Sequence, residues 1–201
     1  MDIFLIFYLV ILLFSVIVHE VAHGLAALSL GDTTAKDAGR LTLNPLKHLD
    51  FFGSFLLPFS LYFLSAGTFV FGWAKPVPFN PLNLKNPKKG AGLIALAGPL
   101  SNFVLALVAA LILRLGNVFN LGLRADFLEL ALVVNLSLMV VNLFPIPPLD
   151  GSKILFALLP QKWEHFYQEL ERFSLFLILI FLFVGFRIVG FLVSLLIRLL
   201  T

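Results

Sequence analysis

The sequence predicts an all-α polytopic membrane protein with about four or five hydrophobic membrane segments and a small membrane-associated β element. Of the 201 residues, 60% are hydrophobic and only 12% are charged, whereas ordinary soluble domains carry about 25% charged residues. The chain has no cysteine, which excludes disulfides and thiolate metal ligands, and its net charge of +3 gives no reason to expect nucleic-acid binding. Five apolar blocks supply the membrane segments, namely 3–30, 51–72, 91–115, 126–146 and 173–200.

Block 3–30 is expected to be a membrane helix that also carries the chemistry. No charged residue lies between Asp2 and the motif His19-Glu20-Val21-Ala22-His23, which then places three ionisable groups within five residues. A charged side chain at the centre of a membrane helix costs about 2.5–3.5 kcal/mol, so these groups need a partner, and a divalent metal is the obvious one. Residues four apart share a helix face, so both histidines can bind the metal while Glu20 lies beside it as a general base.

Block 51–72 is expected to be either re-entrant or an ordinary span. Loop 73–90 contains four lysines and no acidic residue, and the positive-inside rule places such a loop in the cytoplasm. Loop 31–50 also carries basic residues, and if both loops are cytoplasmic, the block must enter and leave on one side. Irregular backbone at that depth is tolerated against protein or a water-filled cavity, so block 51–72 and loop 31–50 are expected to form walls of the site.

The β element is predicted at residues 40–44. The remaining blocks are predicted to be ordinary helices. Arg40-Leu41-Thr42-Leu43-Asn44 alternates like a short strand before Pro45. Blocks 91–115 and 126–146 are expected to cross the membrane outward and back. Residues 152–172 have the pattern of an amphipathic helix at the cytoplasmic surface, and block 173–200 that of one tilted, kinked helix.

Asp150 is the predicted third metal ligand. The segment Pro145-Ile146-Pro147-Pro148 ends the helix of block 126–146 just before it, at the cytoplasmic side. The first helix reaches His19 after roughly 24 Å of a ~30 Å core, so the histidines and Asp150 arrive at one depth. The alternative is that Asp150 only caps the following helix.

Five motifs, spread over about residues 14–159, identify a family. Together they resemble the site-2 proteases, which are intramembrane metalloproteases, and the short bacterial and archaeal members without PDZ-like or CBS-like domains are most similar. The motifs are His19-Glu20-Val21-Ala22-His23, Gly39-Arg40-Leu41-Thr42-Leu43-Asn44-Pro45, Gly72-Trp73-Ala74-Lys75-Pro76-Val77-Pro78, Ala97-Gly98-Pro99-Leu100-Ser101-Asn102, and Asn142 through Gly151.

The resemblance implies one zinc ion per chain, held by His19, His23 and Asp150, with Glu20 as catalytic base. It also implies a catalytic role for Asn142, at the oxyanion or the substrate backbone. The expected activity is hydrolysis of a peptide bond within or next to a transmembrane segment, as in regulated intramembrane proteolysis. The segment 40–44 is expected to bind the unwound substrate by edge pairing. A non-catalytic metal-binding membrane protein or metal transporter is the alternative, although the chain shows no internal repeat of the kind many transporters have.

Three further residues have competing interpretations. Asn142 could instead bond backbone carbonyls freed by the prolines that follow it. Asn102 is expected to serve helix packing rather than catalysis, and His48 to be a surface or interfacial residue rather than a fourth ligand.

The chain is expected to form a single domain, 1–201, with a catalytic core at about 3–160 and a C-terminal membrane helix at about 173–200. Its expected partners are the lipid bilayer and a membrane-protein substrate with a transmembrane helix, and no nucleic acid. The expected location is the prokaryotic plasma membrane, with the active site towards the cytoplasm. The sequence does not fix the oligomeric state.

Overall fold

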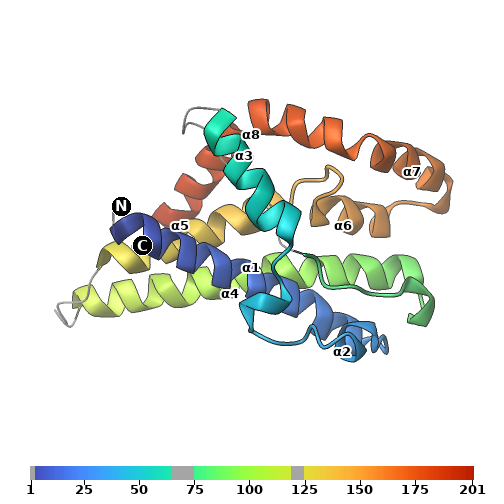
Figure 1. Cartoon of the computed structure of the whole chain (residues 1–201), viewed down its shortest axis with the longest axis horizontal. Coiled ribbons are helices and arrows are strands. Elements are labelled where there is room, and N and C mark those ends of the chain that lie inside the picture. The colour runs from blue at the N-terminus through green and yellow to red at the C-terminus, as the bar shows by residue number, and fades with distance from the viewer. Residues whose placement is uncertain (1–2, 65–74, 119–124) are drawn as a thin grey trace.

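The computed structural model describes residues 3–64, 75–118 and 125–201, and these residues are mostly helical (Figure 1). Three helices are long and apolar enough to cross a membrane, and they are α1 (Ile3–Ser29), α4 (Pro87–Val118) and α5 (Ala125–Asn142). A fourth, α8 (Ser174–Leu200), has halves bent by 62° and qualifies only if both halves form one span. The described residues therefore contain three or four spans, fewer than the upper end of the prediction.

The predicted β element is wrong. The described residues contain no strand, and segment 40–44 forms irregular bends instead. Two local hydrogen bonds explain the difference, because Thr42 Oγ1 accepts from the Asn44 amide and Asn44 Oδ1 accepts from the Leu46 amide. Such bonds from short polar side chains favour turns over extended strands, and the apolar–polar alternation does not reveal them.

Small residues on α4 allow the central helices to pack closely. Ala106, Ala109 and Ala110 are buried against Leu132 and Leu136 of α5 in the main apolar cluster, to which α8 also contributes. Small side chains let membrane helices approach each other, where van der Waals contact replaces the hydrophobic effect. The outward faces of α1 and α4 expose many large apolar side chains, as expected for surfaces in contact with lipid.

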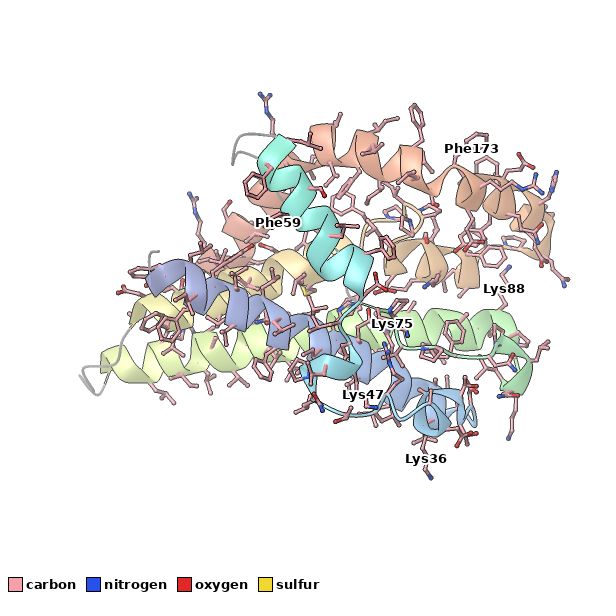
Figure 2. All side chains as sticks on the ribbon, viewed as in Figure 1. Lys36, Lys47, Phe59, Lys75, Lys88 and Phe173 are labelled. Atoms are coloured by element: carbon pink, nitrogen blue, oxygen red, sulfur yellow. The ribbon has the colours of Figure 1, made fainter. Side chains whose placement is uncertain are left out.

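The described residues between α1 and α4 form short helical elements. The chain after α1 forms α2 (Thr34–Asp37), then a π-helical turn (Phe51–Leu56) that leads into α3 (Leu57–Leu64). The rest of block 51–72 lies outside the described residues. Whether the block is re-entrant therefore stays a prediction. Lys36, Lys47, Lys75 and Lys88 lie in the half of the molecule away from the start of α1 (Figure 2).

The predicted amphipathic helix 152–172 is two helices. α6 (Asp150–Leu158) and α7 (Glu164–Arg172) are separated at Pro160, which cannot donate the hydrogen bond that a continuous helix needs. α6 packs against α4, whereas α7 has no buried residue. This break places the start of α6 in the interior and leaves α7 at the surface.

Candidate metal centre

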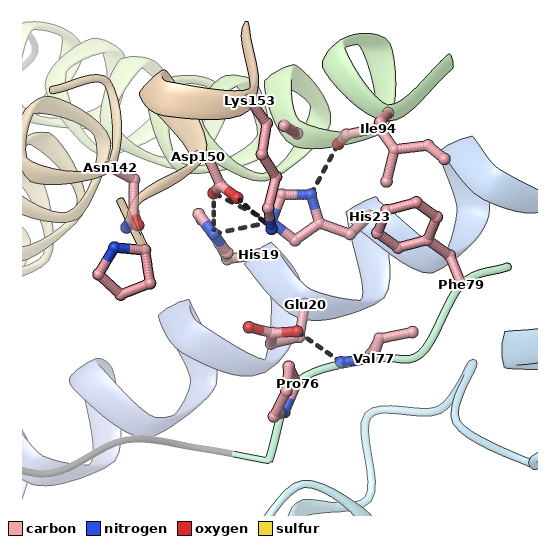
Figure 3. A pocket seen from close by; sticks show the side chains of 13 residues that line it. His19, Glu20, His23, Pro76, Val77, Phe79, Ile94, Asn142, Asp150 and Lys153 are labelled. Carbon is pink, nitrogen blue, oxygen red and sulfur yellow. Dashed lines mark hydrogen bonds and ion pairs between the residues drawn. The ribbon is translucent and has the colours of Figure 1, made fainter. Parts of the chain in front are cut away.

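Two helices from distant parts of the chain bring three metal-binding side chains together (Figure 3). His19 and His23 lie one turn apart on α1, and Asp150 lies in the first turn of α6. The Nε2 atoms of the histidines are 3.0 Å apart, and each is 3.1 Å from Asp150 Oδ2. His19 and Asp150 are buried. The structure thus brings together the three side chains that the sequence predicts as metal ligands.

The second nitrogen of each imidazole fixes which atom faces the centre of this group. His19 Nδ1 donates to Asn102 Oδ1 at 2.6 Å, and His23 Nδ1 donates to the Ile94 carbonyl at 2.7 Å. Because both partners are carbonyl oxygens, which only accept, both Nδ1 atoms carry a proton, so in the neutral imidazoles the Nε2 atoms present their lone pairs to the centre. Ligating histidines in metalloproteins are held in the same way.

This donor set fits a metal ion. With both imidazoles neutral, two Nε2 lone pairs and a carboxylate oxygen lie within about 3 Å of one another, and a cation among them would offset their repulsion. Ligand atoms bound to one tetrahedral zinc at about 2.0–2.1 Å are roughly 3.3 Å apart, close to the separations seen here. Two histidines and a carboxylate also leave the fourth position open, as catalytic zinc sites require.

Two glycines allow the ligands to approach. A Cβ atom on Gly98 of α4 would lie 2.5 Å from the His23 ring and 2.6 Å from the His19 ring. A Cβ atom on Gly151 would collide with the backbone of Leu143 and Phe144, so only glycine lets α6 start beside that segment.

The alternative that Asp150 only caps α6 does not hold, because the N-cap residue of α6 is Leu149 and no side chain caps this helix end.

Glu20 faces the same cavity, and an extended segment positions it. Residues 75–80, named the strap here, run alongside α1, and the Val77 amide donates to Glu20 Oε2 at 2.8 Å (Figure 3). Pro76 and Pro78 on either side have no amide hydrogen. Between them, Val77 therefore offers the only backbone donor, and it is directed at the predicted catalytic base.

Two buried charged residues fix the ends of the strap. Arg40 donates to the Lys75 carbonyl at 2.7 Å. Asp32, with no exposed surface, accepts from the Asn80 amide and the Asn83 side chain, each at 2.7 Å, and also from Thr34. Burial alone would raise the pKa of Asp32, but these hydrogen bonds outweigh it and lower the pKa to about 2. Asp32 is therefore ionised at any physiological pH.

The cavity that the ligands and Glu20 share has a volume of about 180 Å³. Its other described walls come from the strap, from α4 around Ala91–Ala95, and from Asn142, Pro148 and Lys153. None of the described side chains in 31–64 lines it, so the predicted walls from loop 31–50 and block 51–72 are not observed in this part of the chain.

The remaining predicted residues have different outcomes. Asn142 lines the cavity while its side-chain amide donates to the Leu138 carbonyl one turn earlier at 3.0 Å. His48 is fully buried rather than at the surface, and donates to the Thr42 carbonyl at 2.7 Å, away from the metal-binding group.

Sequence reasoning missed three residues around the site. Asn102 was expected to serve packing, yet it bonds a metal-binding histidine and donates to Asn135 Oδ1 and the Ser15 carbonyl. Its signal in the sequence was an amide side chain within an apolar block, because such a group requires polar partners. In the structure this amide is fully buried. Asp32 anchors the strap, and Lys153 Nζ lies 3.9 Å from Asp150 Oδ1. Neither had a sequence signal beyond its charge near a helix end.

The chain is similar to a known peptidase family and to proteins named as zinc metalloproteases. Residues 114–185 match the family model "Peptidase family M50". The chain is 40% identical over 185 residues to "Putative zinc metalloprotease YwhC" of Bacillus subtilis (strain 168), covering 88% of this chain and 80% of that protein.

The chain belongs to peptidase family M50.

A second relative of this M50 chain is "Putative zinc metalloprotease Rip2" of Mycolicibacterium smegmatis, 32% identical over 142 residues, or 69% of this chain and 52% of that protein. No solved structure gives a significant match. The resemblance to site-2 proteases is confirmed, and the protein is an integral membrane metalloprotease of that type, with zinc implied by the family names. The transporter alternative is accordingly set aside.

Proposed function

We propose that this M50 peptidase is an intramembrane endopeptidase that hydrolyses a peptide bond within or next to a transmembrane segment of another membrane protein. One zinc ion per chain would bind His19 Nε2, His23 Nε2 and an Asp150 oxygen. The observation that carries the proposal is the convergence of these three atoms within 3.1 Å, beside Glu20, on helices whose outer faces are apolar.

The chemistry follows from the positions of the side chains. Bound zinc would supply Lewis acidity, which lowers the pKa of a water molecule and polarises the scissile carbonyl. One oxygen of Glu20 is bonded to the Val77 amide, so the other oxygen is free to accept a proton from water and return it to the leaving amine. The Val77 bond limits rotation of the carboxylate and so holds that other oxygen in one orientation.

Asn142 is proposed to bind the oxyanion or the substrate backbone. It lines the cavity, and its amide nitrogen has one hydrogen directed at the Leu138 carbonyl. The second amide hydrogen is available to a substrate oxygen.

The substrate class follows from where the cavity lies. A transmembrane helix hides its carbonyls in hydrogen bonds and must unwind locally to reach the metal. Lys36, Lys47, Lys75 and Lys88 lie in the half of the molecule away from the start of α1 (Figure 2). By the positive-inside rule we place this half in the cytoplasm of a prokaryote, with the lipid bilayer around α1, α4, α5 and α8.

The test is zinc content and cleavage of a transmembrane test substrate by the wild-type protein and by Glu20→Gln, in liposomes. Glu20→Gln should retain one zinc and lose cleavage by roughly 10³-fold or more, since a general base contributes about 10²–10⁴-fold and here also serves as acid. Glu129→Gln, the same chemical change at an exposed position of α5, should behave like the wild type. Loss of zinc in Glu20→Gln, with no cleavage by the wild type, would show Glu20 to be a ligand and refute the proposal.

A further inference from the structure

A second cavity adjoins the catalytic one on the side of α7. It has a volume of about 500 Å³ and shares Phe79, Ala91 and Lys153 with the catalytic cavity. Its other walls come from the first turn of α4, from α6 and from α7. A chain that extends from the metal-binding group past Lys153 therefore enters this second cavity, named the exit groove here.

The floor of the exit groove is built from stacked side chains. The rings of Phe156 on α6 and Tyr167 on α7 are nearly parallel, with centroids 4.3 Å apart. Lys88 Nζ lies 4.3 Å from the Phe156 centroid and donates to the Leu159 carbonyl at 2.5 Å. Lys88 is thus directed at the protein, and its charge is partly compensated by the ring face and the carbonyl dipole.

One face of α7 gives the groove an acidic side. Glu164, Tyr167 and Glu171 follow each other at helical spacing and all line the groove. Burial raises the pKa of the Tyr167 hydroxyl and the nearby Glu171 charge adds to this, against the bond from Ser152. In the described part of the chain, no basic side chain lies within 4 Å of the Glu164 or Glu171 carboxylates, whereas Glu169 on the same helix pairs with Arg172.

We propose that the exit groove binds the cytoplasmic flank of the substrate, a positively charged extended segment between the scissile bond and the cytoplasm. This inference rests on the proposed function. The cytoplasmic flanks of membrane helices are rich in Lys and Arg. Glu164 and Glu171, which have no ion-pair partner among the described residues, complement that charge. Lys153 at the entrance is near Asp150, so basic residues of the substrate are favoured further along, beside Glu164 and Glu171.

The first test compares two transmembrane test substrates that differ only in a basic or a neutral cytoplasmic flank. Wild-type protein should cleave the basic-flank substrate with a lower KM. In Glu164→Gln/Glu171→Gln, the ratio of kcat/KM between the basic and neutral substrates should fall roughly tenfold, since each such charge pair contributes modestly. Glu169→Gln is the matched control and should keep the wild-type ratio. An unchanged ratio in the double variant would overturn the proposal, while failure of wild type to cleave either substrate would refute the proposed function instead.

The second test does not depend on cleavage. Because the chain has no cysteine, single cysteines at position 171 or 169 can be paired with cysteines scanned along the substrate flank, in the Glu20→Gln background. Disulfide cross-linking should occur from position 171, with flank residues on the cytoplasmic side of the scissile bond, and not from position 169. Equal cross-linking from both positions, or none from position 171, would contradict the proposal.

Discussion

The two sides of the catalytic cavity are built differently. On the metal-binding side, His19, His23 and Asp150 lie on helices, and small residues such as Gly98 and Gly151 bring those helices together. On the opposite side, Glu20 is oriented by the strap, an extended segment fixed at its ends by Arg40 and Asp32. The geometry of the metal ligands therefore depends on side-chain volume, whereas the orientation of Glu20 depends on hydrogen bonds. Substitutions should therefore be able to impair zinc binding and the catalytic base separately.

The largest effect is expected from added volume on the metal-binding side. Gly98→Ala places a methyl group about 2.5 Å from both imidazole rings, so the rings or α4 must move. Displacements near 1 Å cost about 10²-fold in activity, and we expect at least this loss together with weakened zinc binding. Zinc titration and cleavage assays check it. Gly190→Ala is the control, because a Cβ there meets nothing within 4 Å. Unaltered zinc binding in Gly98→Ala would show that side-chain volume at position 98 does not set the geometry of the metal ligands.

An intermediate effect is expected from the buried amide behind His19. Asn102→Leu keeps the volume but leaves the His19 Nδ1 proton without its acceptor. Loss of a partner of this kind lowers metal affinity by about 10–100-fold. Competition with a zinc chelator measures the change. Ser101→Ala removes only a hydroxyl bond to the Gly98 carbonyl and should retain normal affinity. Equal affinity in both variants would show that Asn102 serves packing alone.

The smallest effect is expected from loosening the strap. Asp32→Asn weakens the bonds to Asn80 and Asn83, so the Val77 amide is held less firmly against Glu20. We expect kcat to fall about three- to tenfold with zinc content unchanged. Asp37→Asn, at an exposed carboxylate of the same loop, is the control. Loss of zinc together with activity would contradict the separation of the two sides.

The pKa of Asp32 adds a pH criterion to this experiment. A pKa lowered from 3.8 to about 2 means that the stabilisation by the carboxylate is complete above pH 3.8 and is lost as the pH falls through about 2. The ratio of wild-type to Asp32→Asn activity should therefore stay constant between pH 5 and 8. A ratio that changes within this window would show that Asp32 is not continuously ionised.

The metal-binding side could be predicted from the sequence, and the strap side could not. The His19–His23 spacing and the depth of Asp150 depend on helix geometry and membrane thickness, which are regular. The anchors of the strap join residues 48 and 51 positions apart, and no periodic pattern encodes such contacts. The wrong prediction of a strand at residues 40–44 has the same origin. Thr42 and Asn44 turn the backbone through side-chain hydrogen bonds, which the alternation of apolar and polar residues does not reveal.

The separation of the ligands along the chain has a consequence for biosynthesis. His19 and Asp150 are 131 positions apart, so the ribosome must add all the residues between them before the third ligand exists. During synthesis, the nascent chain passes through the insertion machinery beside other newly made membrane helices. Until Asp150 has emerged and α6 has packed, the nascent protein has only two of its three ligands. The proposed cleavage of membrane helices would therefore begin only after α6 has packed against α4.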